Sequence, residues 1–434
     1  MAADQLKILS LSFNVAKTMP SQDEAMRNQW KSMLGLLGQE PLPDLYAISL
    51  QEVSVVPYVY ESLIKGNDAW MSIITNLLYH RGYIQLRYIR VLGTVLAVFG
   101  HTKHLLRLRH LDTTYLRVRN LGQKAAVAIR VQLYGVHYAF MGCHLTAHEW
   151  NLEKRIEDYD YIIENLLFPG GDEFANMLYH DYIIIMGDLN FRLKSQSLDH
   201  DEIVTYVDKG DFKPLVEQDS LLWVQDEGRA FQEFSEAPIT FLPTFKFKIG
   251  HQEHDRKRRP GYTDRILYRA NTYNLEDVAR LDLVADEYQS VPEVTASDHK
   301  PVICSFTSRI IPPEVANRKA LPAYKPIVDF DHVQDWKKGL NDLFVTYQVI
   351  SGEGHYITDY DWVALFKADF QSLEDFEAFI WSSQQRRSQV KHVVAFGEEI
   401  NVVSPGKYCL LYIGAKNCIL GQSNNFHIIA DVVF

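Results

Sequence analysis

Short apolar segments rich in β-branched residues recur through the first 300 residues of this 434-residue chain. They cover residues 7–13, 45–50, 94–99, 125–133, 138–143 and 182–186. Most are continuous rather than alternating, which is typical of strands that are buried on both faces. Helical patterns at 24–37 and 153–167 lie between them. Strands that alternate with helices predict an α/β domain with a large sheet core.

The last third of the chain has a different pattern. Four prolines fall in residues 309–326, which predicts a stiff linker. Beyond it, strand-like pieces at 344–350, 362–367, 376–381, 392–396, 408–413 and 426–429 are separated by Gly, Asp, Asn and Ser. Short strands with frequent turns over about 100 residues indicate an all-β sandwich of immunoglobulin type. We therefore expect two domains, 1–308 and 327–434, on either side of the linker.

Polar side chains stand at one end of many of these apolar segments. Four segments are followed by the clusters Asn14, Gln51-Glu52, His144 and Asp188-Leu189-Asn190. Two further segments are preceded by Asp264-Arg265 and Ser297-Asp298-His299. A single Asp or Asn in such a place is commonly a turn residue or a helix cap. Six clusters that hold two histidines and four carboxylates favour a shared site along one rim of the sheet.

Composition limits the class of protein. Hydrophobic residues make up 47% of the chain and charged residues 23%, as in a globular protein. No apolar run approaches the roughly 20 residues of a membrane-spanning helix, and residues 1–10 lack the pattern of a secretion signal. The four cysteines, at 143, 304, 409 and 418, fit neither a zinc site nor a disulfide framework. We therefore expect a cytoplasmic protein.

Charge is distributed unevenly along the chain. The formal net charge is 44 − 55 = −11, which disfavours nucleic acid as a partner because that affinity depends on neutralising phosphates. Residues 101–130 nevertheless hold seven basic side chains against one acidic one, and residues 245–259 hold six against two. Each segment can be a solvated loop. The hypothesis that we favour is that both face one small, highly anionic ligand.

The residue types at the expected rim favour phosphate chemistry. Glu and Asn oxygens beside further carboxylates suit a hard cation such as Mg²⁺, and no soft-ligand set for zinc is present. A histidine next to an Asp pair has its pKa raised from about 6.5 by the carboxylates. Together these groups indicate metal-assisted hydrolysis of a phosphate ester.

Five motifs carry a family resemblance. They are Leu50-Gln51-Glu52, Gly187-Asp188-Leu189-Asn190-Phe191-Arg192, Pro243-Thr244-Phe245-Lys246, Arg259-Pro260-Gly261-Tyr262-Thr263-Asp264-Arg265 and Ser297-Asp298-His299-Lys300-Pro301. In this order they resemble the inositol polyphosphate 5-phosphatases, a branch of the Mg²⁺-dependent endonuclease/exonuclease/phosphatase fold. The resemblance covers residues 1–308. It implies a four-layered α/β/β/α sandwich that removes the 5-phosphate of phosphoinositides such as phosphatidylinositol 4,5-bisphosphate, and of soluble inositol polyphosphates.

The resemblance also implies roles for individual residues. The metal ligands would be Glu52, Asn14 and Asp298. The catalytic residues would be His144, Asp188, Asn190, Asp264 and His299. The substrate-binding residues would be Lys124 for the phosphate that links inositol to lipid, and Lys246, Lys257 and Arg259 for the 4-phosphate. Asp188 would orient and deprotonate the attacking water, Asp264 would hold His299, and His299 and Asn190 would contact the transferred phosphoryl group.

Several positions depart from the pattern of this family. Phe245 stands where the family has a tyrosine, and Gly261-Tyr262 where it has Ala-Trp. An asparagine and two glycines around Lys124 are replaced by Gln123, Ala125 and Ala126, and a further asparagine is replaced by Ile156. These departures bear on substrate preference and rate rather than on reaction type. The alternatives are an endonuclease of the same fold and a catalytically weak, lipid-binding scaffold.

The C-terminal segment carries a second resemblance. Residues 361–367, 408–412 and 421–423, with Phe426, are similar to the SKICH domain that follows the phosphatase in the skeletal-muscle- and kidney-enriched and the proline-rich members of the family. That domain is associated with membrane localisation and protein contacts. The resemblance implies peripheral recruitment to the plasma membrane or endoplasmic reticulum, and a protein partner.

Overall fold

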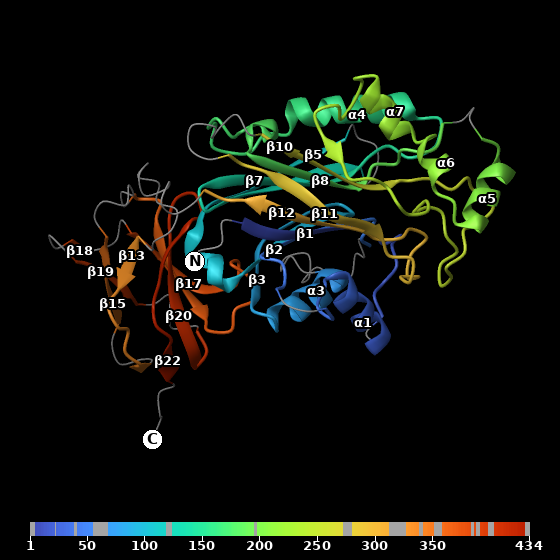
Figure 1. The fold of residues 1–434 in the computed structure, drawn as a ribbon. Coiled ribbons are helices and arrows are strands. Elements are labelled where there is room, and N and C mark those ends of the chain that lie inside the picture. The colour runs from blue at the N-terminus through green and yellow to red at the C-terminus, as the bar shows by residue number, and fades with distance from the viewer. Residues whose placement is uncertain are drawn as a thin grey trace.

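A computed structural model of the chain describes most of both expected domains (Figure 1). The described residues are 5–21, 23–38, 41–54, 68–118, 124–194, 198–271, 280–311, 327–337, 342–350, 358–382, 386–387, 391–397 and 403–429. Among the described helices, none combines the length and the apolar character of a transmembrane segment. Most of the expected linker, residues 312–326, lies outside the described part of the chain.

Two six-stranded sheets form the N-terminal domain. The first has the order β11 (Leu283–Ser290), β12 (Val302–Arg309), β1 (Gln5–Asn14), β2 (Leu45–Gln51), β4 (Thr94–His101) and β3 (Tyr83–Val91). The second has the order β5 (Leu108–Arg117), β6 (Ala125–Leu133), β7 (Val136–His144), β8 (Tyr182–Asp188), β10 (Asp264–Ala270) and β9 (Ser235–Glu236). All six strands expected from the apolar runs are present.

Helices cover the outer face of each sheet (Figure 1). The first sheet carries α1 (Glu24–Met33) and α3 (Ala69–Tyr79), and the second carries α4 (Leu152–Asn165) and α7 (Ser220–Asp226). The remaining helical elements are α5 (His200–Lys209), α6 (Lys213–Val216) and the 3₁₀ turns η1 (Thr102–Arg107) and η2 (Met177–Tyr179). This arrangement confirms the α/β/β/α sandwich.

Alternate residues of the central strands serve two different cores. In β1, Leu6 and Ile8 belong to the core between the sheets, whereas Leu11 and Phe13 pack against α1 and α3. A strand with an apolar layer on each face needs apolar residues at every position, which explains the continuous runs. The predicted helix over 24–37 is shorter in the structure, because Gly35 takes a left-handed φ of 69° just after the helix ends at Met33.

Strand register brings the polar clusters to one rim. Parallel pairing sets Asn14 of β1 beside Gln51 of β2, and His144 of β7 beside Asp188 of β8. Antiparallel pairing sets Asp264, the first residue of β10, beside Asp188. Segments that end in a polar group and segments that begin with one therefore meet at the same edge, as the sequence predicts.

The C-terminal domain is a second sandwich. One sheet has the order β13 (Val328–Phe330), β15 (Leu343–Val349), β19 (His392–Phe396) and β18 (Arg386–Arg387). The other has β14 (Trp336–Lys337), β22 (Phe426–Ile429), β20 (Gly406–Ile413), β16 (Trp362–Lys367) and β17 (Phe376–Trp381), and β21 (Ile419–Gln422) pairs with β20. A separate apolar core lies between these sheets, which confirms the predicted β-sandwich.

The apolar core between the two N-terminal sheets extends into the C-terminal domain. Phe366 and Leu411 of the C-terminal domain belong to the same buried cluster as Leu86 and Leu105 of the N-terminal domain. Backbone hydrogen bonds cross this seam, from the Gln85 N–H to Gln371 O (2.8 Å). The seam lies away from the polar rim (Figure 1). Gln85 pairs with Phe99 near the end of β4, whereas the rim end of β2, at Leu50, pairs with Val95 near the start of β4.

Candidate active site

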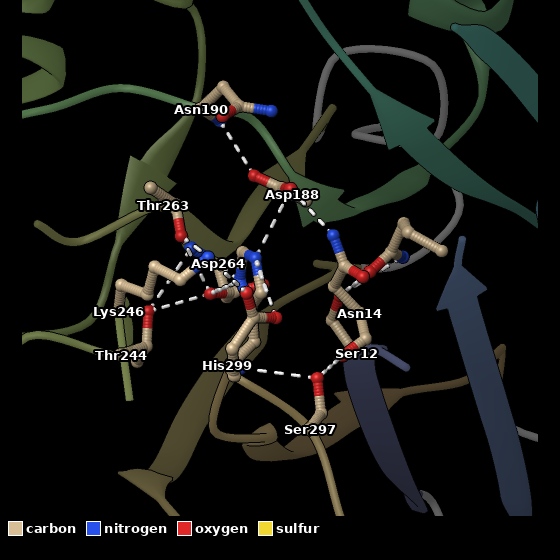
Figure 2. A network of polar contacts seen from close by, with 12 residues as sticks. Ser12, Asn14, Asp188, Asn190, Thr244, Lys246, Thr263, Asp264, Ser297 and His299 are labelled. Atoms are coloured by element: carbon tan, nitrogen blue, oxygen red, sulfur yellow. Dashed lines mark hydrogen bonds and ion pairs between the residues drawn. The ribbon is translucent and has the colours of Figure 1, made fainter. Parts of the chain in front are cut away.

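A pocket of about 470 Å³ opens at the polar rim. Nine of the residues expected to form the site line it: Glu52, Lys124, His144, Asp188, Asn190, Lys246, Arg259, Asp298 and His299. Asn14 and Asp264 lie directly behind the pocket wall, in contact with Asp188 and His299 (Figure 2). Lys257 is exposed and is not part of the lining. The fold therefore brings together eleven of the twelve expected residues.

Asp188 is held by hydrogen bonds on both of its carboxylate oxygens. Its Oδ2 accepts from Nδ2 of Asn14 (2.9 Å) and its Oδ1 from the backbone N–H of Asn190 (3.1 Å). Burial by itself would raise the pKa of Asp188, but its contact with His144 and the charge of His299 outweigh burial and hold the pKa far below its usual value. Asp188 is therefore a buried anion that keeps its charge.

His299 is held between two carboxylates at the floor of the pocket. Its Nδ1 lies 2.9 Å from Oδ2 of Asp264, and its Nε2 lies 4.0 Å from Oδ2 of Asp188. Thr244 and Thr263 each donate a hydroxyl hydrogen bond to the same oxygen of Asp264, which fixes that carboxylate (Figure 2). Burial opposes the charged imidazole, but Asp264 and then Asp188 raise the pKa of His299 to about 9. His299 is therefore a cation near neutral pH.

His144 and Lys124 form a second pair beside Asp188. The Lys124 ammonium contacts Nε2 of His144, which lies 3.3 Å from Oδ2 of Asp188. Burial lowers the pKa of Lys124 to about 8 although Asp188 and Glu52 oppose the shift. Burial, followed by the charge of Lys124, lowers the pKa of His144. The pocket thus holds a neutral imidazole beside Lys124 and a charged imidazole at His299.

The oxygen ligands in the pocket fit a divalent cation. Glu52, Asp188 and Asp298 line the pocket and concentrate negative charge there. Asp264 lies behind the wall, and its buried Oδ1 has no hydrogen-bond partner among the described residues. Ligand atoms of Asp188, Asp264 and His299 lie within 4.8 Å of one another. A protonated His299 cannot use its nitrogens as metal ligands, so the oxygens of Glu52 and Asp298, backed by Asn14, are the better set. This set suits a hard cation.

The loop after residue 244 brings further cations to the pocket. Phe245 pairs with Gly261 and His299, and Lys246 extends its ammonium to 3.0 Å from Oδ2 of Asp298. Arg259 forms an ion pair with Glu149. Arg258, a basic residue of the same segment for which no role was expected, also lines the pocket.

Other lining residues were missed as well. Arg192, Lys17 and His148 face the same pocket. Arg192 is the last residue of the motif that runs from Gly187 to Arg192, so its position in the sequence could have identified it. Lys17 and His148 have no comparable signal. They lie within four residues of Asn14 and His144, on loops whose path the strand pattern does not define.

The hypothesis that the whole basic segment 101–130 faces the ligand is wrong. Arg130 is buried and bonds to Asp112 (2.9 Å) and Asp172 (3.0 Å), so its charge is neutralised inside the second sheet. Lys103 pairs with Asp44 at 2.8 Å. Of the described basic residues in this segment, only Lys124 reaches the pocket. Arg130 and Lys103 thus serve the fold, because their partners come from other parts of the chain.

Several residues that differ from the family pattern are buried in the structure. Ala125 and Ala126 begin β6 and are fully buried, with Ala125 in register with His144. Ile156 packs into the core under α4. Gln123 lies outside the described residues. Alanines in place of glycines thus suit the start of a strand, where glycine would weaken the pairing.

A four-layered sandwich with buried acidic and histidine residues at one rim defines a class of metal-assisted phosphoesterase. Residues 11–305 match the family model described as Endonuclease/Exonuclease/phosphatase family 2, and residues 328–428 match the SKICH domain. The chain therefore belongs to the endonuclease/exonuclease/phosphatase family, and it carries a SKICH domain after the catalytic one.

Curated relatives cover both domains. The chain is 28% identical over 437 residues to Phosphatidylinositol 4,5-bisphosphate 5-phosphatase A of Rattus norvegicus, which spans 97% of this chain and 42% of the relative. It is 26% identical over 441 residues to Inositol polyphosphate 5-phosphatase K of Mus musculus, which spans 98% of this chain and 88% of the relative. The chain thus covers less than half of the first relative and most of the second.

Solved structures agree on the fold. The inositol polyphosphate 5-phosphatase domain of SPsynaptojanin, in complex with inositol (1,4)-bisphosphate and calcium ion, matches with a TM-score of 0.60 and 30% identity, over 73% of this chain and 90% of that domain. Cimex nitrophorin matches with a TM-score of 0.56 at 21% identity, over 71% of this chain and 100% of that protein. The second likeness concerns the fold alone.

Proposed function

We propose that this chain is a Mg²⁺-dependent phosphatase that hydrolyses the 5-phosphate of phosphoinositides such as phosphatidylinositol 4,5-bisphosphate, and of soluble inositol polyphosphates. The observation that carries this proposal is the buried, charged His299 between Asp264 and Asp188, in a pocket whose walls also hold Lys124 and Lys246. Such a pocket offers cations to several phosphates and one buried anion to a water. The named relatives act on substrates of this class.

Each group has a definable part in the reaction. Asp188 orients the attacking water and takes its proton as the new O–P bond forms, because so weak a base does not deprotonate water beforehand. His299 and Asn190 bind the phosphoryl oxygens, on which negative charge builds up. The bond from phosphorus to the inositol oxygen breaks, and that oxygen takes a proton from solvent.

The cation site belongs beside Asp188. Glu52, Asn14 and Asp298 would hold Mg²⁺, and bound Mg²⁺ would supply positive charge to the phosphoryl and leaving oxygens. The proposal of Mg²⁺ in particular rests on the preference of that ion for carboxylate and amide oxygens. Neutral His144 keeps Lys124 directed into the pocket on the side of Asp188.

We also propose a cytoplasmic protein that contacts the plasma membrane or endoplasmic reticulum peripherally, with a protein partner at its SKICH domain and no nucleic-acid partner. Trp150 and Ile249 support membrane contact, because both line the mouth of the pocket and are exposed by 76% and 55%. Large apolar side chains exposed beside a site suit a lipid surface. The net charge of −11 argues against nucleic acid.

The deciding experiment is phosphate release from phosphatidylinositol 4,5-bisphosphate. We expect turnover with Mg²⁺ that is abolished by excess chelator and by Asp188→Ala, whereas Asp208→Ala, at an exposed carboxylate outside the pocket, stays active. Undiminished turnover in chelator or in Asp188→Ala would contradict the proposal. Cleavage of plasmid or abasic DNA would favour an endonuclease, and tight lipid binding with background turnover would favour a scaffold.

A further inference from the structure

Four aromatic side chains gather on the outer face of the sheet that holds β16 and β17. Trp362 contacts Phe376 and Phe379, with ring centroids 5.3 and 5.6 Å apart, and Phe379 contacts Trp381 at 5.5 Å. The strand register sets Trp381 opposite Trp362, on the same face. Phe376, Phe379 and Trp381 are exposed, and all four rings line a groove of about 400 Å³. Single exposed aromatic residues are common on protein surfaces, but a contiguous cluster beside a groove indicates a contact site.

This groove continues an interface that the chain already uses. Alternate residues of a strand share one face, so Trp362 stands on the same face of β16 as Ala364 and Phe366. Ala364 and Phe366 are buried in the core shared with the N-terminal domain. Ile413 and Ile419 belong to that core and also line the groove. A face that packs against one protein surface therefore extends past the seam, where its aromatic rings are exposed.

The segment that borders the groove is acidic. Residues 368–379 hold four acidic side chains and no basic one. Glu377 is neutralised by Lys367 at 3.3 Å, whereas Glu374, which lines the groove, has only a long ion pair with Arg87 at 4.0 Å. Burial raises the pKa of Glu374 although Arg87 opposes the shift. A second cation beside Glu374 would therefore stabilise its carboxylate.

This charge decides among the occupants that an exposed aromatic groove can have. A membrane surface that contains phosphoinositides is anionic, so the acidic segment would repel it. A second copy of the chain would bring the same acidic segment and a net charge of −11 to the contact. A protein segment that carries both apolar and basic side chains is complementary to the rings and to the carboxylates.

We infer that the groove binds a partner protein through a segment that places an apolar side chain among the aromatic rings and a lysine or arginine beside Glu374. The inference rests on the protein partner proposed above for the SKICH domain, and it gives that partner a surface and a chemistry. The groove lies at the seam, away from the polar rim (Figure 1). A partner bound there leaves the catalytic pocket open.

Random short peptides displayed on phage and selected on the full chain provide the probe. We expect the selected peptides to combine Leu, Phe or Trp with Lys or Arg. In fluorescence polarisation, Glu374→Lys should weaken their binding roughly tenfold or more, and replacing the basic residues of the peptide with Glu should restore binding to this variant. Phe379→Ser should weaken binding to a similar extent. Phe344→Ser, at an exposed ring of β15 in the other sheet of the domain, is the matched control and should leave binding unchanged.

Three results would overturn the inference. The first is a selection that yields no peptide, or peptides that bind Glu374→Lys and Phe379→Ser as well as they bind the wild-type chain. The second is binding to vesicles of phosphatidylcholine and phosphatidylserine that Phe379→Ser abolishes, which would assign the groove to lipid. The third is a dimer in analytical ultracentrifugation that Phe379→Ser dissociates, which would assign it to a second copy. Release of phosphate from a soluble inositol polyphosphate should be equal in all variants, so failure of the inference leaves the proposed reaction untouched.

Discussion

His299 illustrates how much one residue depends on its neighbours. Its imidazole is buried in the pocket wall, and burial alone would lower its pKa and favour the neutral form. The carboxylate of Asp264, itself held by two threonine hydroxyls, reverses that preference. The order of motifs in the sequence predicts that Asp264 and His299 meet. The threonines Thr244 and Thr263 were seen only as parts of motifs, and their role as supports of Asp264 emerges from the structure.

Replacing Asp264 tests this dependence directly. In Asp264→Asn the anion that stabilises the charged imidazole is lost, so we expect kcat to fall by about 100-fold or more while the fold is kept. The measurement is phosphate release under saturating substrate, together with a thermal melt. Asp208→Asn, at an exposed carboxylate, serves as control. Activity within about threefold of wild type would show that the charge of His299 is unimportant.

A second buried histidine, His180, favours the neutral imidazole and lies outside the site. Burial lowers its pKa to about 4, with Arg130 and His110 adding to the shift and a hydrogen bond to Met177 O opposing it. His137 packs against it, with ring centroids 6.2 Å apart. A neutral imidazole is thus part of the core beneath η2. The residue was not singled out from sequence, because burial of a lone histidine is a property of packing.

The charge state of His180 predicts an acid-sensitive core. The pKa of His180 is about 6.5 in the unfolded chain and about 4 in the folded protein. As the pH falls below 6.5, the unfolded chain therefore binds a proton that the folded protein does not. The free energy of unfolding decreases until about pH 4, where the folded protein is protonated as well. Between pH 7 and pH 5, His180 lowers the free energy of unfolding by about 2 kcal/mol. Denaturant unfolding at both pH values should show a smaller difference for His180→Phe than for wild type. An equal difference would contradict the assignment, and His427→Phe, at an exposed histidine, is the control.

At the scale of elements, the close approach of β7 and β8 defines the centre of the rim. A Cβ at Gly187 would lie 2.0 Å from the carbonyl oxygen of Cys143, so this position accepts no side chain. The contact keeps His144 and Asp188 in register. The sequence shows Gly187 only as part of a motif. Its close approach to the backbone of β7 depends on how the partner strand lies, which the sequence does not show.

Gly187→Ala should therefore separate the two strands. We expect a loss of about 3 kcal/mol or more in the free energy of unfolding, because the clash is with backbone that cannot move aside. Gly38→Ala provides a matched control, since its added methyl group meets only one atom at an ordinary 3.5 Å. Denaturant unfolding of both variants measures the effect. Equal stabilities would show that β7 and β8 separate at little cost.

The loop over residues 245–259 divides into parts that face the pocket and parts that face solvent. The sequence predicted that both Lys257 and Arg259 grip a 4-phosphate. The structure brings Arg259 to the pocket wall, where Glu149 holds it, and leaves Lys257 exposed. Which side chains of a loop are exposed depends on the path of the loop in space. A loop has no regular repeat in its sequence from which this exposure could be predicted.

Alanine variants separate these two residues. Arg259→Ala should lower kcat/KM for a 4,5-bisphosphate by roughly 10- to 100-fold, the worth of a charge-assisted hydrogen bond, and affect a 5-monophosphate less. Lys257→Ala should stay within about threefold on both substrates. Arg256→Ala, whose partner Asp208 lies outside the pocket, controls for changes in loop charge. A larger loss in Lys257→Ala than in Arg259→Ala would show that the loop rearranges on binding.

For the whole molecule, the seam between the domains is the main finding that sequence did not anticipate. Prolines in the linker suggested two bodies joined by a spacer. In the structure, Arg109 donates to the carbonyl of Ile419 (3.2 Å), and apolar residues of both domains form one cluster. Ile310 and Ile311, expected in the linker, are buried in that cluster. Domains that share a core are expected to unfold together.

Calorimetry should accordingly record one cooperative transition for the full chain. Ile419→Asp, which places a charge in the seam, should lower the midpoint of that single transition by several degrees or more. Ile429→Asp, at a position that is 40% exposed in the same domain, should change the midpoint little. Two resolved transitions in the wild-type protein would contradict a shared core. Activity assays on residues 1–308 alone would then become informative about the SKICH domain.

Sequence by itself predicted six strands of the N-terminal domain and the rim, because apolar runs and the polar groups at their ends are local properties. The order of motifs, through the family resemblance, implied eleven of the twelve residues gathered there. The sequence also indicated which chemistry the rim can support, since the ability of carboxylates, amides and histidines to bind metal ions, phosphates and protons follows from their residue type. Tertiary structure alone decided which charges are free. Arg130 is neutralised by Asp172, Arg259 is held by Glu149, and Arg192 has no carboxylate partner among the described residues. Electrostatic partners are distant along the chain, and only register and packing bring them together.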